Sequence, residues 1–315
     1  FHFLGAFNSI ELKLVDFRFN LRGKILDHTK EDLSKKEVVI VEIDDESFKL
    51  IPDPIPYGRG TVWSRAIRNL TDADAKVIVI DVMFDKPDHQ TKNLLSYLES
   101  NKSKIDFDLL DGDLELLKAI EYANSHQTPT KIIFSGKRSE DANRIPTQYL
   151  TPPTKKLIDS DIEFDFGLVN TVTDLDGYIR RYPIFYPVIG DTSLYYTLAI
   201  ESVLAFNDYE GEKNIHLNPK DRVASLGPLK IKTYGKTNVF QINYSGPVSS
   251  AFNTFPRYPL SSILDTKDYE IGDKDEDGDL LEDIDWMDNY IDESSPFYFL
   301  FSQNNPFKDK IVVIG

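Results

Sequence analysis

The sequence contains two nearly uninterrupted apolar runs, Val38-Val39-Ile40-Val41-Glu42-Ile43 and Val77-Ile78-Val79-Ile80-Asp81-Val82-Met83-Phe84. Strands that are buried on both faces of a sheet are continuous runs of this kind, and they are typical of parallel sheets. Between the two runs, Thr61 to Leu70 is the candidate for a connecting helix, which a parallel pair of strands requires. The two runs therefore predict an α/β fold.

The same alternation of helix and strand continues on both sides of these runs. It predicts a helix around Leu114 to Ala123, a strand at Lys131 to Phe134 and a last strand at Lys310 to Gly315. The middle of the chain has the turn signals of antiparallel hairpins instead. The hairpins are expected at Phe166 to Val172 with Tyr178 to Val188, and at Leu229 to Thr233 with Val239 to Tyr244, with a buried helix at Thr192 to Phe206 between them. The predicted fold class is thus α/β, with a mixed, largely parallel sheet, flanking helices and antiparallel hairpins in the second half.

The first residues have the pattern of an amphipathic helix. Apolar residues recur at intervals of four and three, at Phe3, Phe7, Ile10, Leu14, Phe17 and Leu21. This spacing is that of a coiled-coil seam, but fewer than three heptads are present. Two interpretations stay open: the seam meets a second copy of the chain in a homodimer, or it packs on its own domain, which is the interpretation favoured here. The organisation predicted is a helix over 1–23 and a single α/β domain over 24–315.

Composition restricts the function. The 315 residues are 41% hydrophobic and 12% aromatic, which indicates a globular protein. A formal net charge of −16 argues against nucleic acid as a partner, because phosphate binding needs a basic surface. The chain has no cysteine and five scattered histidines, and no apolar run reaches the length of a membrane span. We find no arrangement of nucleophile and base, so we do not expect an enzyme.

The acidity is concentrated between Asp265 and Glu293, where fourteen carboxylates stand against two lysines, a local net charge of −12. Alternating carboxylates closed by a glycine are the pattern of a calcium loop. The candidate ligands are Asp273, Asp275, Asp277, Asp279 and Asp283. An EF-hand loop would have glutamate at its twelfth position, where this chain has Ile284. An acidic insertion over about 265–296 is therefore expected, either as a site for Ca²⁺ or as a solvated acidic loop.

Other charged residues follow the predicted strands. Asp44 and Asp45 end one strand and Asp81 ends the next, at the carboxyl edge where open α/β sheets bind ligands. These carboxylates either contact a ligand or metal, or cap the helices that follow. Arg180 follows a turn and either holds an anionic ligand or forms salt bridges. Arg59 follows a proline-rich turn near the same edge, where a guanidinium fork can bind a carboxylate.

Eight short segments occur in a fixed order along nearly the whole chain. They are Ile10–Phe19 with Leu21-Arg22-Gly23, Val39–Ser47, Pro56-Tyr57-Gly58-Arg59, Ala75–Phe84, Gly167–Asn170, Asp174–Arg181, Ile242–Pro247 and Lys310–Gly315. In this order they resemble extracellular sensor domains of the CHASE class, of its second type, which accompany bacterial adenylate cyclases, histidine kinases and Ser/Thr kinases. Tyr57-Gly58 stands where that family has Trp-Pro, and the acidic insertion is not a general family feature.

The resemblance implies an extracytoplasmic, non-catalytic sensory domain of a membrane-anchored bacterial signalling protein. It places the N-terminal helix beside the membrane and the membrane-spanning helices outside this chain. The stimulus is an unknown small ligand or protein, and the ligand-contacting candidates are Asp44, Asp45, Arg59, Asp81 and Arg180. The alternative is a structural or adhesive cell-surface module that calcium stabilises.

Overall fold

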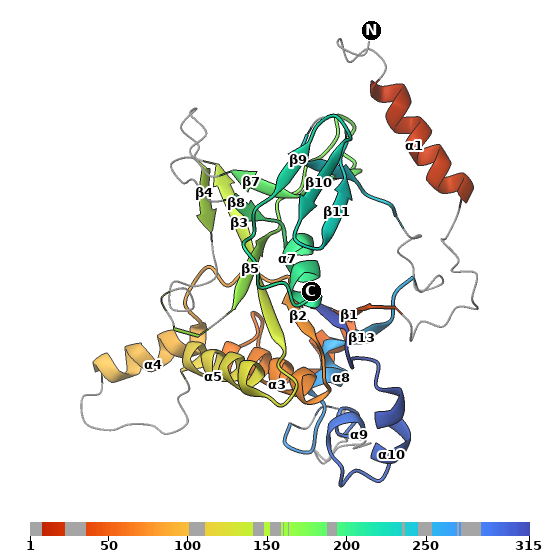
Figure 1. Ribbon diagram of the computed structural model, residues 1–315. Helices are drawn as coiled ribbons and strands as arrows, with labels where there is room; N and C mark the ends of the chain where they lie inside the picture. The colour runs from red at the N-terminus through yellow and green to blue at the C-terminus, as the bar shows by residue number, and fades with distance from the viewer. Residues whose placement is uncertain are drawn as a thin grey trace.

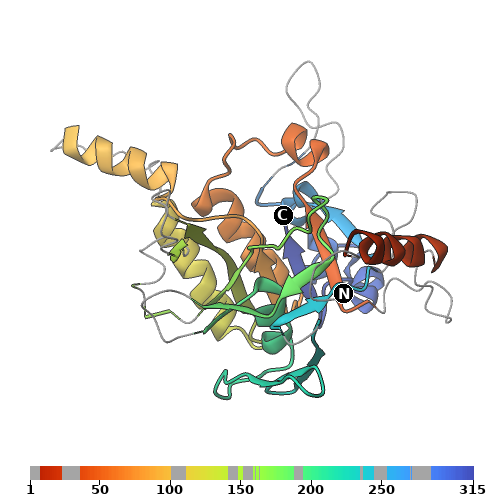
Figure 2. The same cartoon turned by 90° about the horizontal axis from the view of Figure 1, so that it is seen from above.

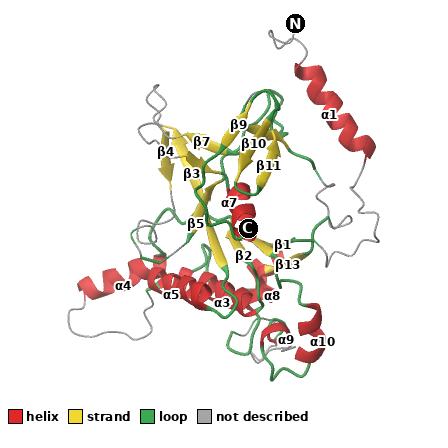
Figure 3. Cartoon of the chain, viewed as in Figure 1, coloured by secondary structure: helices red, strands yellow, loops and turns green. Residues whose placement is uncertain are grey.

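The computed structural model describes residues 8–22, 36–100, 111–140, 148–151, 159, 161–162, 164–187, 194–234, 237–244, 254–269, 271 and 285–315. Among them, six parallel strands form the central sheet (Figures 1 and 3). In spatial order they are β13 (Arg257–Pro259), β1 (Val38–Glu42), β14 (Ile311–Ile314), β2 (Val77–Ile80), β3 (Lys131–Glu140) and β5 (Asp165–Leu168). A further strand, β4 (Gln148–Thr151), pairs antiparallel with β3. The predicted parallel sheet and fold class are confirmed.

The last strand of the chain lies in the middle of this sheet. β14 pairs with β1 through Val312 opposite Val39, and with β2 through Val312 opposite Ile78. Successive side chains of a strand point to opposite sides of the sheet. In β2 both sets are buried, whereas in β1 Val39 and Val41 are buried and Val38 and Ile40 on the other face are half-buried. Ile78 and Ile80 belong to the larger core on one face, and Val77 and Val79 to a smaller core on the other. This arrangement explains the continuous apolar runs in the sequence.

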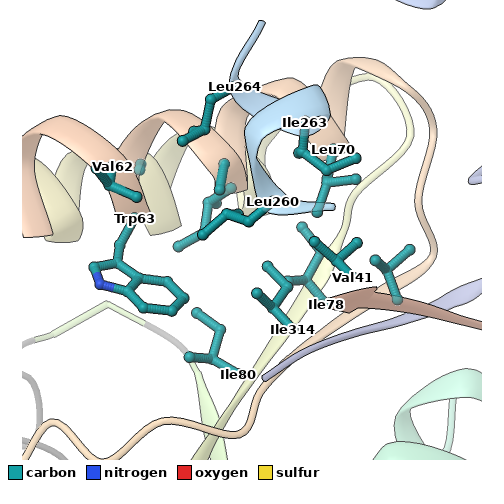
Figure 4. Packing of buried hydrophobic residues seen from close by; sticks show 14 of the residues in the cluster. Val41, Val62, Trp63, Leu70, Ile78, Ile80, Leu260, Ile263, Leu264 and Ile314 are labelled. Carbon is teal, nitrogen blue, oxygen red and sulfur yellow. The ribbon is translucent and has the colours of Figure 1, made fainter. Parts of the chain in front are cut away.

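Helices cover both faces of the sheet. The larger core lies between the sheet and α3 (Ser64–Asp72), α5 (Gly112–Ser125) and α8 (Leu260–Leu264), which lie below the sheet in Figure 1. On the other face, α7 (Leu198–Phe206) packs on β2, β3 and β5. Figure 4 shows Trp63 and Leu70 pointing toward Ile80 and Ile314. Each large side chain buried in this way contributes roughly 1.5–3 kcal/mol to the stability of the fold.

The remaining described helices are short or lie at the periphery. Figure 2 shows α1 and α4 extending to opposite sides of the molecule. These helices are α1 (Asn8–Arg22), α2 (Asp45–Leu50), the π-helix η3 (Arg59–Trp63), α4 (His89–Ser100), α9 (Asp288–Ile291), α10 (Tyr298–Phe301) and the 3₁₀ helix η5 (Ser302–Asn304). No described helix has the length and apolar character needed to cross a bilayer.

The second half of the chain differs from its predicted pairing. The first predicted hairpin is present only as a single antiparallel bridge, between Val172 and Arg181, because β5 joins the parallel sheet beside β3. The second is wrong as a strand pair, because Leu229–Lys232 and Val239–Gln241 each pair with other strands. β6 (Arg181–Pro183) pairs with β12 (Val239–Gln241), and β7 (Phe185–Pro187) pairs with β8 (Leu194–Tyr196). β9 (His216–Asn218), β10 (Val223–Leu226) and β11 (Leu229–Lys232) form a separate antiparallel sheet.

A turn and a helix predicted in that half are present in the structure. The turn at Asp174 to Gly177 is closed by the Gly177 N–H, which donates to the Asp174 carbonyl at 2.9 Å, and Gly177 has a positive φ of 84°. The buried helix predicted at Thr192 to Phe206 begins only at Leu198, since the described residues before it form β8.

Candidate ligand-binding site

A cavity of about 510 Å³ opens at the carboxyl ends of β1 and β2. This is the edge at which open α/β sheets bind their ligands. The volume falls within the range of small-molecule sites. The cavity is lined by Ile43, Phe48, Ile55, Pro56, Tyr57, Arg59, Trp63, Val82, Met83, Phe84, Asp85, Lys86, Pro87, Asp88, His89 and Lys92.

Three parts of the chain supply these walls. Ile43 and Phe48 come from the end of β1 and from α2, and Val82 to Asp88 follow β2. Trp63 ends η3, and its ring packs edge to face against Phe84 with 5.3 Å between the ring centroids. Most of the wall is therefore apolar and is held by the main core.

The side chain of Arg59 connects the segments that form the cavity wall. Its side chain is buried, and its Nη1 donates to Asp113 Oδ1 at 2.5 Å. Its Nη2 donates to the carbonyl oxygen of Lys86, and its guanidinium lies 4.5 Å from the centroid of the Phe84 ring. The fork thus ties η3 to α5 and to the segment after β2. Arg59 therefore lies at the cavity wall, and these hydrogen bonds are made to groups of the protein itself.

A group of buried carboxylates supports Arg59, and the sequence interpretation missed it. Asp88 Oδ1 accepts from the Arg59 backbone N–H at 3.1 Å, and Asp88 Oδ2 accepts from Gln90 N–H at 2.8 Å. Asp113 Oδ2 accepts from the Asp88 backbone N–H at 3.3 Å, beside the bond from Arg59 to its Oδ1. A single buried charge is costly, so these hydrogen bonds stabilise both carboxylates. The available signal was the place of each aspartate at a helix start, because Asp88 directly precedes α4 and Asp113 lies in the first turn of α5, which Asp111 caps.

Charged side chains also stand at the cavity mouth. Lys86 and Lys92 are exposed, and so is Asp85. The His89 ring Nδ1 lies 3.6 Å from Asp88 Oδ1. The sequence interpretation had noted aspartates after this strand but not the basic residues that follow them, because only the path of the chain after β2 brings them to the cavity.

The predicted aspartates lie around the cavity and not in its lining. Asp44 caps α2, where its Oδ1 accepts from the Ser47 N–H at 2.9 Å, and Asp45 is the exposed first residue of that helix. The capping interpretation therefore describes Asp44. Burial, followed by the charge of Asp44, raises the pKa of Tyr57, so Asp44 acts on one wall of the cavity through its charge.

Asp81 lies at the end of β2, where its N–H donates to the Ile314 carbonyl at 2.9 Å. Partial burial raises the pKa of its carboxyl. Burial also raises the pKa of Tyr182 to about 12, and the charge of Asp81 contributes to that shift. Asp81 is thus near β6 and immediately precedes Val82 of the cavity wall.

Arg180 belongs to a different cluster, outside the cavity lining. It donates to Asp174 Oδ2 at 3.0 Å, to Asp176 Oδ1 at 2.9 Å, and through Nε to Asp16 Oδ1 at 2.7 Å. Its hydrogen bonds with Asp16 and Asp176, in that order, raise the pKa of Arg180. The neighbouring Arg181 donates to Asp174 Oδ1 at 2.9 Å through its Nε. The salt-bridge interpretation therefore describes Arg180.

This cluster attaches α1 to the rest of the protein. The hydrogen bond from Arg180 lowers the pKa of Asp16, and the Phe19 ring meets the Tyr244 ring edge to face at 5.7 Å. The seam side chains at Leu14, Phe17 and Leu21 are 50%, 61% and 76% exposed. The favoured prediction, that the seam packs on its own domain, is wrong at these positions, because α1 uses its other face for the contact.

Several predicted positions lie outside the described residues. These are the seam residues Phe3 and Phe7, the side chain of Ile10, and all five candidate calcium ligands, Asp273, Asp275, Asp277, Asp279 and Asp283. Within the described ranges, no group of three or more histidine, aspartate or glutamate side chains has the arrangement of a metal site.

In the comparisons with known proteins, a family model matches the chain over residues 1–315, and that family is described as the CHASE2 domain. No curated protein and no solved structure matches the chain.

Proposed function

The chain belongs to the CHASE2 domain family, whose members are sensory extracellular domains of signalling proteins and are not themselves catalytic, and we propose that this domain senses a small ligand in the cavity at the ends of β1 and β2. We further propose that it lies outside the cytoplasm and is anchored to the membrane by helices beyond this chain. It is the input part of a signalling protein, and any catalytic output belongs to another part.

The observation that carries this proposal is the cavity itself. It lies at the sheet edge where ligands bind in open α/β folds, and its apolar walls are shaped by a buried ion pair between Arg59 and Asp113. A site that is formed before the ligand arrives loses less conformational entropy on binding. These properties support a binding role for the cavity.

A chain of contacts leads from the cavity to α1. Val82 lines the cavity, and the preceding Asp81 acts on Tyr182 of β6. Tyr182 follows Arg181 and Arg180 in the sequence, and Arg180 holds Asp16 of α1. A ligand that binds one of two arrangements of this path more tightly shifts their populations. In our proposal this shift changes the position of α1.

The exposed seam of α1 supports a second element of the proposal, a homodimer through this helix. The face with Asp16 and Phe19 is used within the chain, while Leu14, Phe17 and Leu21 remain exposed at the spacing of a coiled-coil seam. Burying such side chains against a second copy is favourable by roughly 1.5–3 kcal/mol each. A movement of α1 in one copy would then be transmitted to α1 of the other copy.

The absence of cysteine from the chain makes the proposed coupling directly measurable. We would place spin labels at Asn20→Cys on α1 and Lys230→Cys on β11, both exposed positions, and measure their distance distribution by electron paramagnetic resonance. Val82→Phe fills part of the cavity and imitates a ligand, so we expect the distribution to shift. Val203→Phe, a partly exposed position on α7 outside the cavity lining, is the matched control and leaves the distribution unchanged.

A distribution that is identical in the parent and in folded Val82→Phe protein would show that the cavity does not act on α1. If Val82→Phe does not fold, Met83→Phe enlarges the neighbouring wall residue and is judged by the same criterion. In cells, the full-length protein is expected in the membrane fraction, with this domain open to a protease added from outside. Protection of the domain under those conditions would contradict the proposed location.

A further inference from the structure

We infer that the ligand of this cavity is an uncharged, compact apolar molecule with an oxygen that accepts a hydrogen bond from the indole N–H of Trp63. The inference rests on the proposed function, since it names the chemical class that the sensory cavity takes. It follows from the apolar surface of the lining, from the balance of its charges and from a hydrogen-bond donor that the protein leaves unused.

Apolar side chains form the wall of the cavity from its interior to its rim. Trp63, Tyr57 and Phe84 are buried in the wall. Phe48 and Ile55 line the same cavity and are 49% and 65% exposed. Exposed apolar groups at a concave site gain stability when a ligand removes them from water. A ligand with a compact hydrocarbon body therefore suits both the buried wall and this rim.

The charged side chains of the lining do not favour a ligand of either sign. Arg59 is paired with Asp113, with 2.5 Å between the Nη1 and Oδ1 atoms. The remaining charges, with the histidine counted as neutral, are two cations and two anions, namely Lys86, Lys92, Asp85 and Asp88. A charged head group of either sign therefore finds as many repelling as attracting groups in the lining.

The buried charges of the lining are held by the protein. The Arg59 guanidinium donates to Asp113 and to the Lys86 carbonyl, and the Asp88 carboxylate accepts from two backbone N–H groups. The other charged side chains of the lining are exposed, where solvent screens them. Moving an ion from water into an apolar site without a partner is costly. The part of the ligand that enters the cavity is therefore uncharged.

One polar group of the wall has no partner within the protein. Trp63 is 3% exposed and lines the cavity. Among the described residues, its indole N–H donates to no group, and the nitrogen atom remains accessible. Figure 4 shows this nitrogen, in blue, on the side of the ring that is turned away from Ile80 and Ile314 of the core. Because buried donors require an acceptor, the molecule that fills the cavity supplies one.

The indole N–H of Trp63 can be observed directly. The chain has two tryptophans, so the ¹⁵N-labelled protein gives two indole N–H signals in a nuclear magnetic resonance spectrum. The other tryptophan, Trp286, packs on Tyr258, Tyr290 and Phe307, and Trp286→Phe leaves the signal of Trp63 alone. Four probes share a ring of six carbons and differ in one group: cyclohexanone, methylenecyclohexane, cyclohexanecarboxylate and cyclohexylammonium.

We expect cyclohexanone to move the indole proton of Trp63 to higher frequency, because a hydrogen bond to oxygen deshields this proton. Methylenecyclohexane has the same shape without the oxygen, so it should bind without a shift in this direction. The two charged probes should bind more weakly than the ketone by about tenfold or more. Val82→Phe fills part of the cavity and should abolish the shift, whereas Val203→Phe lies outside the lining and should keep it.

A variant without the donor gives a second test. Trp63→Phe should lower the affinity for cyclohexanone, relative to methylenecyclohexane, by about two- to tenfold, as expected for one neutral hydrogen bond. Trp286→Phe is the matched control and should leave the ratio of the two affinities unchanged. Both affinities are measured by titration calorimetry. If Trp63→Phe does not fold, the shift of the indole proton in the Trp286→Phe protein decides the question.

Other results overturn the inference. Binding of the ketone without this shift, or an equal shift with methylenecyclohexane, shows that the donor of Trp63 is not used. Binding of either charged probe as tightly as the ketone shows that the ligand class is wrong, and so does the absence of binding by all four probes. The sensory proposal fails separately, through the spin-label measurement on Val82→Phe, which uses no ligand.

Discussion

Arg59→Lys keeps the positive charge at the cavity wall and removes the planar fork that holds three groups together. In the structure the guanidinium donates to Asp113 through Nη1 and to the Lys86 carbonyl through Nη2, and it lies over the Phe84 ring. An ammonium can point at one acceptor but cannot present two donors in the same fixed geometry. We therefore expect the substitution to destabilise the protein although the charge is conserved.

The expected size follows from the groups that lose their partners. Both side chains of the pair are buried, at 7% and 3% exposure, so solvent screening does not weaken the contact. A hydrogen bond to a charged group contributes about 1.5–3 kcal/mol, and complete removal of one partner of a buried pair costs about 3–5 kcal/mol. Because lysine retains the charge and one contact, we expect a loss of about 2–3 kcal/mol in the free energy of unfolding. In a chain of this size that loss lowers the melting temperature by about 3–5 °C.

Thermal and urea unfolding, followed by circular dichroism, test this expectation. Arg18→Lys is the matched control, because Arg18 is an exposed residue of α1 and the same change there should have little effect. A double-mutant cycle with Asp113→Asn separates the ion pair from other causes. The reasoning is refuted if Arg59→Lys unfolds like Arg18→Lys, or if Asp113→Asn destabilises the Arg59→Lys protein as much as the parent.

Three further predictions concern α1 and the acidic insertion. The pKa of Asp16 lies below its ordinary value of about 3.9 because Arg180 donates hydrogen bonds to it. The contribution of Asp16 to the docking of α1 should therefore be full above about pH 3.9 and be lost as the pH falls through the lower pKa of the folded protein. Asp16→Asn should match the parent in stability only at the acid end of a pH series, and a constant difference down to about pH 2 would contradict this prediction. Leu14→Asp with Phe17→Asp should abolish self-association and keep the fold, as judged by sedimentation and circular dichroism. Aspartates at two exposed polar positions of α1 should leave both the association and the fold unchanged, and a Leu14→Asp, Phe17→Asp variant that still associates would exclude this seam. Calcium should raise the melting temperature of the parent above the value measured with chelator, because binding to the native state stabilises it by mass action, and Asp275→Ala with Asp277→Ala should remove the difference. Equal melting temperatures of the parent with millimolar calcium and with chelator would show that the insertion is a solvated acidic loop.

The central sheet was determined by local sequence. Runs such as Val77 to Ile80 and Ile311 to Ile314 are apolar at every position, because both faces of each strand are covered. Their composition therefore carries the information that they belong to a parallel sheet, whatever their neighbours are. The helices at Ser64–Asp72 and Gly112–Ser125 were predictable within a few residues for the same reason, since a repeating apolar face is a local property.

Strand pairing in the second half was decided by tertiary structure. β5 and β6 follow each other around a real turn at Gly177, yet β5 pairs with β3 and β6 with β12. Segments of three or four residues carry too little pattern to select a partner, and contacts from the rest of the fold select it instead. The same reason explains why residues just before Leu198 form a strand although their composition suits the helix that follows.

The candidate site divides in the same way. Sequence placed Arg59 and the aspartates after β1 and β2 at the carboxyl edge of the sheet, because strand direction alone fixes that edge. It did not place Asp113 beside Arg59, or Asp16 beside Arg180, since these partners are 54 and 164 residues apart in the chain. These contacts form only because the packing of helices and strands brings distant segments of the chain together. A local pattern of charge or hydrophobicity does not show which distant residues will be in contact.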